Sequence, residues 1–227
     1  MSMYDFIRGP LVWVAFLVFI FGTAYQVYRF YQLSRPKDRY RLRIPFGKPP
    51  KDPDETPDEP TLTWWQQMRL SVVGVNPVMV SVTTLFHLAL VLTPFFVLGH
   101  NVLLDLAWHV SLPSLPEAVA DGLTIVVIAG GVFFLLRRIF LARVRAISTV
   151  YDYVVLLIAT TPFITGFLAY HHFFDYDTVI LLHILAGEIM LMAVPFTKLV
   201  HMPYFFINRF VLVHENTLGA GGSRTWR

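Results

Sequence analysis

The run VILLHILAGEIMLMAVPFTKLV, from Val179 to Val200, decides the fold. Only two of its side chains, Glu188 and Lys198, carry a charge. An α-helix needs about 20 mostly apolar residues to cross the hydrocarbon core of a bilayer, which is about 30 Å thick. The run therefore predicts a membrane-spanning helix.

Four further apolar runs precede it, so the chain is expected to cross a membrane five times. The composition agrees, because 56% of the 227 residues are hydrophobic and only 15% are charged, whereas soluble domains have about 25% charged residues. The sequence thus excludes a soluble globule and predicts one all-α membrane domain over residues 1–227. The four runs are Leu11 to Tyr28, Pro77 to Leu98, Gly122 to Leu136 (which we expect to extend at both ends) and Tyr153 to Ala169.

The basic residues gather on one side of these spans. Of the 18 Lys and Arg, nine lie between Arg29 and Arg69, four between Arg137 and Arg145, and four from Lys198 onward. The connections 100–120 and 171–178 contain none. Because positively charged loops stay on the cytoplasmic side, we expect the N-terminus on the outer, periplasmic side and the C-terminus in the cytoplasm.

Two polar segments are expected in the cytoplasm, the loop 29–70 and the tail 203–227. Inside the loop, the stretch IPFGKPPKDPDETPDEP at 44–60 has six prolines and mixed charges, so it cannot build a core. We expect an extended tether that contacts a cytoplasmic subunit.

Four of the eight histidines lie within or directly after two of the predicted spans. His87 and His100 belong to the second span, and His183 and His201 to the fifth. A histidine at membrane depth is costly and suggests function, although a single one could be a buried neutral ring bonded to a carbonyl. Since the two spans run in opposite directions, His87 is level with His201 near the inner side, and His100 with His183 near the outer side.

The angle around the helix axis that separates the two histidines differs between the two spans. On the fifth, 201 minus 183 is 18 residues, about five whole turns, which places both rings on one face of a straight helix. On the second, 100 minus 87 is 13 residues, which leaves the rings about 220° apart. Pro94 would have to kink or unwind that span to aim both rings at the partner helix.

Paired neutral imidazoles suit haem b held by two axial histidines. Zinc or copper would prefer three or four ligands at one depth, and the absence of Cys excludes cysteine-held iron-sulfur clusters and covalently attached c-type haem. We therefore expect two stacked haems b. Five glycines could leave room for haem or merely allow close helix packing: Gly99, Gly130, Gly131, Gly166 and Gly187.

Two stretches carry a resemblance to a known family. HILAGEIMLMAVPFTKLVH, His183 to His201, resembles the last helix of the γ subunit (cytochrome b) of respiratory nitrate reductase. FHLALVLTPFFVLGHNVLL at 86–104, with SLPSLPE and the Arg137-Arg138 pair, is similar to cytochrome b subunits of the Hmc, Tmc and Dsr transmembrane redox complexes of sulfate-reducing bacteria. The resemblance implies an inner haem on His87 and His201 and an outer haem on the other pair. The spacing on the second span is shorter than in nitrate reductase, so its quinol-site residues are not carried over.

The resemblance also implies a place and partners. The place is the bacterial inner (cytoplasmic) membrane. A periplasmic multihaem cytochrome c or menaquinone would exchange electrons on the outer side, and a cytoplasmic iron-sulfur subunit related to heterodisulfide reductase on the inner side, alongside other membrane subunits and without nucleic acid. The chain would be a non-catalytic or quinone-reactive subunit of an oxidoreductase complex.

Several residues beside the ligands have two readings each. Glu188, in mid-span, is either a protonated packing residue or part of a proton path. His171 and His172 are either a solvated turn or proton acceptors for a quinol, and we assign no role to His109 and His214. Three basic residues would either hold haem propionates or only set topology: Lys198, Arg137 and Arg138.

The outer connections are acidic, which would attract a basic cytochrome or would simply reflect the exclusion of positive charge. The acids are Asp105, Glu117, Asp121, Asp175 and Asp177. The main alternative function is a haem-free membrane anchor or a proton-conducting transporter subunit. A stand-alone ferric or quinone reductase would need a flavin or nicotinamide site, and the sequence has no glycine-rich phosphate loop.

Overall fold

The computed structural model of the chain describes residues 3–34, 65, 74 and 76–210. All regular structure within them is helical. The helices are α1 (Met3–Phe6), the π-helical turn η1 (Ile7–Leu11), α2 (Val12–Ser34), α5 (Pro77–Phe96), α6 (Leu98–Trp108), α7 (Glu117–Phe140), α8 (Ala142–Arg145), α9 (Val150–Tyr170), α10 (Tyr176–Ala193), the 3-10 turns η2 (Val194–Phe196) and η3 (Lys198–Val200), and α11 (His201–Phe210). The proline-rich stretch 44–60 and the tail from 211 lie outside the described residues, so the tether stays a prediction.

Among the described residues, five helical stretches are long and apolar enough to cross a membrane. Together they confirm the predicted all-α, multi-pass membrane protein, and the third span extends beyond its predicted ends, as expected. The stretches are Tyr4–Leu33, Pro77–Phe96, Glu117–Phe140, Val150–Tyr170 and Tyr176–Phe196.

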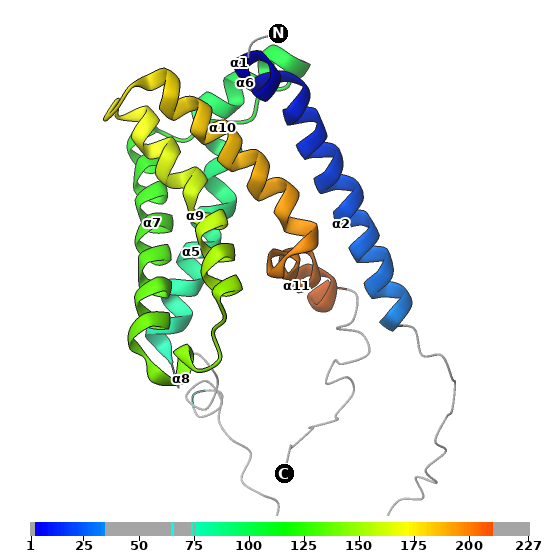
Figure 1. Cartoon of the computed structure of the whole chain (residues 1–227), viewed down its shortest axis with the longest axis vertical. Helices are drawn as coiled ribbons and strands as arrows, with labels where there is room; N and C mark the ends of the chain where they lie inside the picture. Colours follow the sequence, from blue (N-terminus) through cyan, green and yellow to red (C-terminus); the bar gives the residue numbers. More distant parts are fainter. Residues whose placement is uncertain (1–2, 35–64, 66–73, 75, 211–227) are drawn as a thin grey trace, which may run out of the picture.

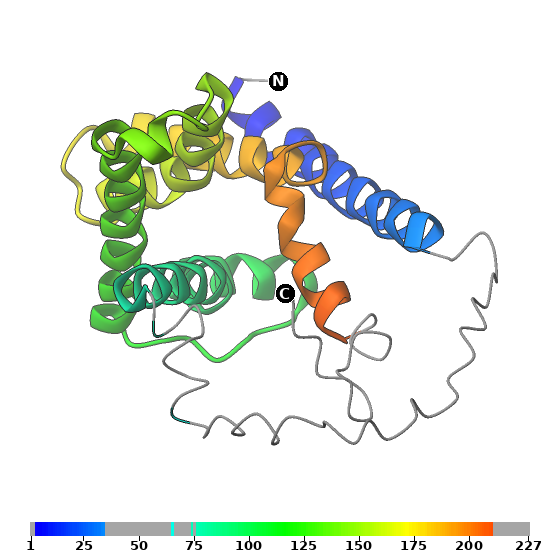
Figure 2. The ribbon, with the colours of Figure 1, turned by 90° about the horizontal axis from the view of Figure 1, so that it is seen from below.

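The spans are arranged in an arc. α5 packs along α7, α7 along α9, α9 along α10 and α10 along α2, an order that can be followed from below in Figure 2. α5 and α10, which carry histidines, are not packed along each other. Figure 1 places α1, α6 and the α9–α10 turn at one end of the bundle and α8 at the other.

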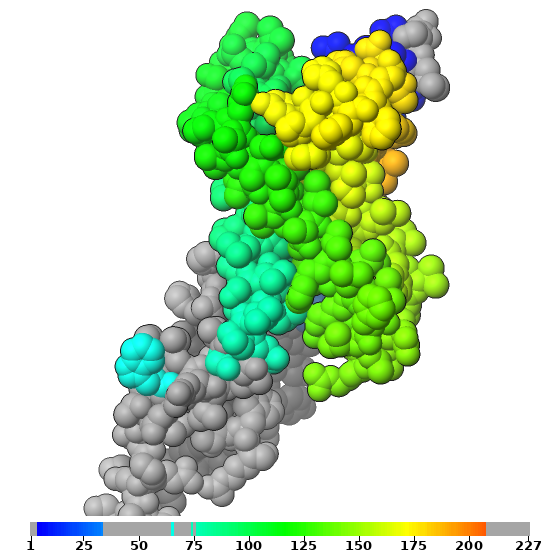
Figure 3. Space-filling view, turned by 90° about the vertical axis from the view of Figure 1, so that its left-hand side faces the viewer, coloured from blue at the N-terminus to red at the C-terminus, as the bar shows by residue number. Residues whose placement is uncertain are grey.

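The outward faces of the spans are apolar. On α7, which crosses the face seen in Figure 3, large side chains such as Ile125, Val132 and Phe140 are exposed. Contiguous apolar exposure of this kind would be unfavourable in water, so these faces are suited to lipid.

Two glycines of α7 allow it to lie close to its neighbours. A Cβ atom on Gly130 would lie 2.7 Å from Cδ2 of Phe86 on α5, and one on Gly131 would lie 2.5 Å from Cγ2 of Thr160 on α9. Phe86 also belongs to the buried core between these helices. Of the two readings of these glycines, the structure therefore shows helix packing.

Replacing Gly131 by Val is expected to lower the free energy of unfolding by about 1–3 kcal/mol, because the added methyl groups would overpack the contact with Thr160. Thermal unfolding of the protein in detergent measures the effect. Gly122→Val is the matched control, since a Cβ on Gly122 meets nothing within 4 Å. Equal destabilisation by both substitutions would contradict the packing role of Gly131.

Candidate functional site

The four histidines of the predicted spans meet in two pairs. The ring centroids of His87 and His201 are 5.9 Å apart, with the ring planes at 88°. Those of His100 and His183 are also 5.9 Å apart, with the planes at 21°. The structure thus brings together the same two pairs that the sequence predicts from depth in the membrane.

All four rings are anchored in the same way, through Nδ1 and a main-chain carbonyl oxygen. A carbonyl can only accept, so each Nδ1 carries a proton, and Nε2 is the nitrogen with the lone pair in the neutral form of each ring. Metal-binding histidines commonly have this arrangement, because a bond at one nitrogen fixes the ring and the tautomer for the other. The distances are 2.7 Å from His87 to Thr83, 2.8 Å from His100 to Pro94, 2.9 Å from His183 to Pro162 and 2.7 Å from His201 to Lys198.

His100 reaches its position because the second span is broken. α5 ends at Phe96, Val97 is extended (φ −73°, ψ 134°), and α6 begins at Leu98. Because the helix is broken here, the Pro94 carbonyl oxygen can accept a hydrogen bond from the His100 ring. The Phe96 carbonyl oxygen accepts from the backbone N–H of Leu115 at 2.9 Å. The unwinding that the 13-residue spacing required is therefore confirmed, and it lies three residues after Pro94.

The fifth span differs from expectation, since it is not one straight helix from His183 to His201. α10 ends at Ala193 and is followed by η2, the extended residue Thr197 (φ −119°) and η3. Pro195 has no N–H to donate and disfavours helix at the residue before it. The prediction that five whole turns align the two rings was wrong: they face the second span because the chain bends between them.

In each pair the two imidazoles lie at a separation that can be compared with that of two rings on one metal. Imidazole nitrogen lies about 2 Å from a bound metal, so two nitrogens on opposite sides of one metal are about 4 Å apart and the ring centres are about one ring radius further on each side. The 5.9 Å centroid separations fit this arrangement. Within the part of the chain that the structure describes, no three His, Cys, Asp or Glu side chains gather as a metal-ion group.

Of the remaining candidate glycines, Gly166 lies beside His183. A Cβ on Gly166 would be 3.0 Å from Cε1 and 3.1 Å from Nδ1 of His183, so this glycine makes room for the imidazole itself. A Cβ on Gly99 or Gly187 would meet nothing within 4 Å, so for these two both predicted readings stay predictions.

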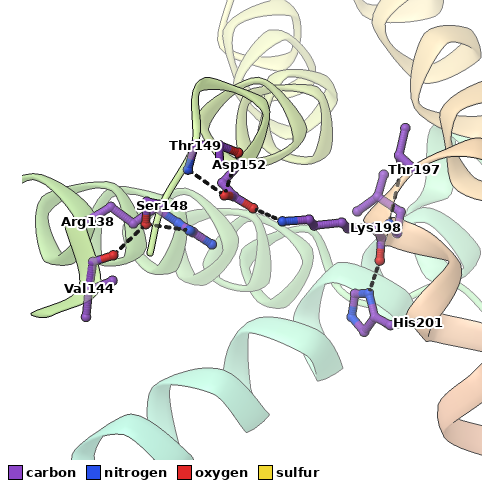
Figure 4. A network of polar contacts seen from close by, with 9 residues as sticks. Arg138, Val144, Ser148, Thr149, Asp152, Thr197, Lys198 and His201 are labelled. Carbon is purple, nitrogen blue, oxygen red and sulfur yellow. Dashed lines mark hydrogen bonds and ion pairs between the residues drawn. The ribbon is translucent and has the colours of Figure 1, made fainter. Parts of the chain in front are cut away.

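Lys198 lies close to His201 in sequence but is paired with a protein carboxylate. Its Nζ is 2.5 Å from Oδ1 of Asp152, as Figure 4 shows. Asp152 is 8% exposed and also accepts from the N–H and hydroxyl of Thr149, which caps α9. Sequence reasoning missed Asp152, although Thr-x-x-Asp is a recognisable capping box.

The two arginines at the end of α7 differ in their surroundings. Arg138 donates to the Ser148 hydroxyl at 3.2 Å and so links α7 to the turn after α8. Arg137 lies in the last turn of α7, beside the apolar side chains of Phe133 and Phe140. Their role towards haem propionates stays a prediction, as does that of Lys198.

At the end of the bundle that holds α1 and α6, the α9–α10 turn is tied to α7. His171 Nε2 is 3.0 Å from Oδ1 of Asp121, and the Tyr170 hydroxyl donates to Glu117 at 2.9 Å. His172 has a left-handed backbone (φ 52°), so it is a turn residue. His171 therefore already has a carboxylate partner, and its use by a quinol stays a prediction.

Glu188 is the most deeply buried carboxylate of the spans. It is 4% exposed, and neither oxygen has a hydrogen-bond partner among the described residues. Both of its predicted roles, packing and proton transfer, stay predictions. His109 ends α6 in a left-handed conformation (φ 54°), which gives it a structural place outside the pairs.

No protein-family model matches the chain. A protein of Nitratidesulfovibrio vulgaris strain Hildenborough is 37% identical to it over 240 residues, and the match covers 97% of this chain and 96% of that protein. The similarity therefore extends over nearly the whole of both chains.

Proposed function

The chain belongs to the same family as the Nitratidesulfovibrio vulgaris protein, and we propose that it is a di-haem cytochrome b subunit that conducts electrons across a membrane. The observation that carries the proposal is that two imidazoles lie 5.9 Å apart, found twice, with every Nδ1 bonded to a carbonyl. His87 and His201 would hold the inner haem, and His100 and His183 the outer one. When bound, a b-type haem supplies a reversible one-electron carrier.

The residues of the chain would do three things for such a carrier. Four main-chain carbonyls would fix the rings and raise the basicity of each Nε2. They belong to Thr83, Pro94, Pro162 and Lys198. The apolar spans would keep the histidine pairs within the lipid core. The two pairs, one on α5 and α11 and the other on α6 and α10, provide successive positions along the bundle.

Partners follow from the charge asymmetry and from the family resemblance. With the basic ends inside, the protein would lie in a bacterial inner membrane with His100 and His183 towards the periplasm. The outer donor or acceptor would be a multihaem cytochrome c, menaquinone or both, and the inner one an iron-sulfur subunit like that of heterodisulfide reductase, with other membrane subunits beside them.

An absorption spectrum of the purified chain tests this function. Reduction with dithionite is expected to give the sharp α and Soret bands of bis-histidine haem b. A featureless visible spectrum from chain purified out of haem-replete cells would instead support a haem-free anchor or a proton-conducting transporter subunit, in which the same histidines pack or relay protons.

The acidic outer surface provides a prediction about the periplasmic partner. Asp175 is not suitable for neutralisation, because its side chain caps α10 and replacing it would disturb the helix. The Thr178 hydroxyl (2.7 Å) and backbone N–H (3.0 Å) donate to the Asp175 carboxylate and lower its pKa. Asp105 and Asp177 are exposed and take no part in that cap. Asp105→Asn with Asp177→Asn is expected to slow outer-haem reduction by a basic cytochrome several-fold at low salt, through lost electrostatic attraction.

Stopped-flow reduction at several ionic strengths measures this effect. The matched control removes two acids from the predicted inner loop, Asp54→Asn with Glu55→Gln, and should leave the rate unchanged. If the outer double variant kept both its rate and its salt dependence, electrons would enter by another route, and membrane quinol would be the better donor.

A further inference from the structure

We propose that three residues of α2, a helix that carries none of the paired histidines, position His201 against His87. These residues are Gly22, Gln26 and Phe30, and we call them the seat. The proposal rests on the proposed function only in naming the inner haem as the group affected. Its structural part, that the seat holds the segment 195–204 in place, does not depend on haem.

The three residues form one stripe on α2. They follow one another at intervals of four, so they lie on the same face of the helix. At the first position, a Cβ on Gly22 would be 2.7 Å from Cγ and 2.8 Å from Cβ of Pro195. Pro195 is among the most deeply buried side chains, and its ring occupies the space that the glycine leaves open.

Gln26, at the second position, bonds to two points of the segment. Its Nε2 donates to the carbonyl oxygen of Pro195 at 2.7 Å, and its Oε1 accepts from the hydroxyl of Tyr204 at 3.3 Å. Phe30, at the third position, stacks on the Tyr204 ring with centroids 4.8 Å apart. The two ends of the segment that contains His201 are therefore held by one face of one helix.

The segment needs an external support because its own backbone is interrupted. Between Ala193 and His201 the chain passes through two 3-10 turns and the extended residue Thr197, so no continuous helix fixes His201 relative to α10. The His201 ring is bonded to the Lys198 carbonyl inside the same segment. Moving the segment therefore moves the ring.

The partner ring is fixed elsewhere. His87 is bonded to Thr83 within α5, so the 88° angle between the two ring planes depends on where the segment lies. In a ferric haem with two axial imidazoles, the anisotropy of the EPR signal depends on that angle. The seat should thus set a spectroscopic property of the inner haem without touching it.

The test uses the purified full-length protein and the variant Gln26→Leu, which keeps the volume of the side chain and removes both hydrogen bonds. We expect a changed anisotropy of the inner-haem EPR signal and a shifted inner midpoint potential, with the outer-haem signal unchanged. Tyr204→Phe, which keeps the ring stacking, should give a smaller change of the same kind. The matched control is Gln32→Leu on the same helix, where Gln32 donates to the hydroxyl of the exposed Tyr28 and to no other described residue.

Amide hydrogen exchange supplies a readout that needs no haem. In Gln26→Leu, the segment 196–204 should exchange faster than in the wild type, while α9 is unchanged. Unaltered exchange and spectra would overturn the seat, and so would equal changes at both haems or throughout the chain. If the wild type held no inner haem, the proposed function would fail, and hydrogen exchange would still decide the seat.

Discussion

Replacing His183 or His100 by Ala is expected to remove the outer haem and leave the inner one, whereas replacing His87 or His201 should do the reverse. Each substitution would delete one of the two proposed axial ligands and leave the other pair intact on its own carbonyl anchors. The haem-to-chain ratio should fall from two to one in each variant. Because the two proposed haems would occupy separate positions, the lost one would be identified by its midpoint potential and EPR signal.

The control for these variants is His109→Asn, because Asn tolerates the left-handed backbone at this position. Both haems should remain. The assignment would be wrong if His100→Ala removed the same haem as His87→Ala, since that would place both rings of the second span on one iron.

Gly166→Val is expected to remove the outer haem as completely as His183→Ala does. The glycine leaves the His183 ring just enough room, with a Cβ position 3.0 Å from Cε1, and the ring is also held by its bond to the Pro162 carbonyl on the same helix. A branched side chain would push the imidazole off that carbonyl. Gly166→Ala adds a single methyl group and should keep the haem but shift its midpoint potential.

Haem content and potentiometric titration of both variants measure these effects, and the inner haem of the same protein serves as an internal control. Gly122→Val, in open space on α7, controls for adding a branched side chain to a span. A Gly166→Val protein with a normal outer haem would show that His183 does not bind in the position described here.

The spans could be predicted from sequence because the requirement for about 20 apolar residues is local. The pairing of His87 with His201 followed from depth alone, since antiparallel helices put early and late residues at one level. The break near Pro94 could also be foreseen, because two rings about 220° apart on a regular helix cannot face one partner.

Other features depend on contacts between distant residues, which leave no local pattern. The run around Pro195 reads as continuous helix by hydropathy, although Pro195 itself is a local signal for a break; that this break packs on Gly22 of α2 could not be foreseen. Gln26 and Tyr204 are 178 positions apart. Likewise, whether Gly131 or Gly166 serves helix packing or a ring depends on which helix lies opposite.

Quantifying haem b extracted from the purified chain, against its protein concentration, tests the central claim most directly. The account predicts two haems b per chain, one for each histidine pair. One haem per chain, or none after expression in haem-replete cells, would contradict it.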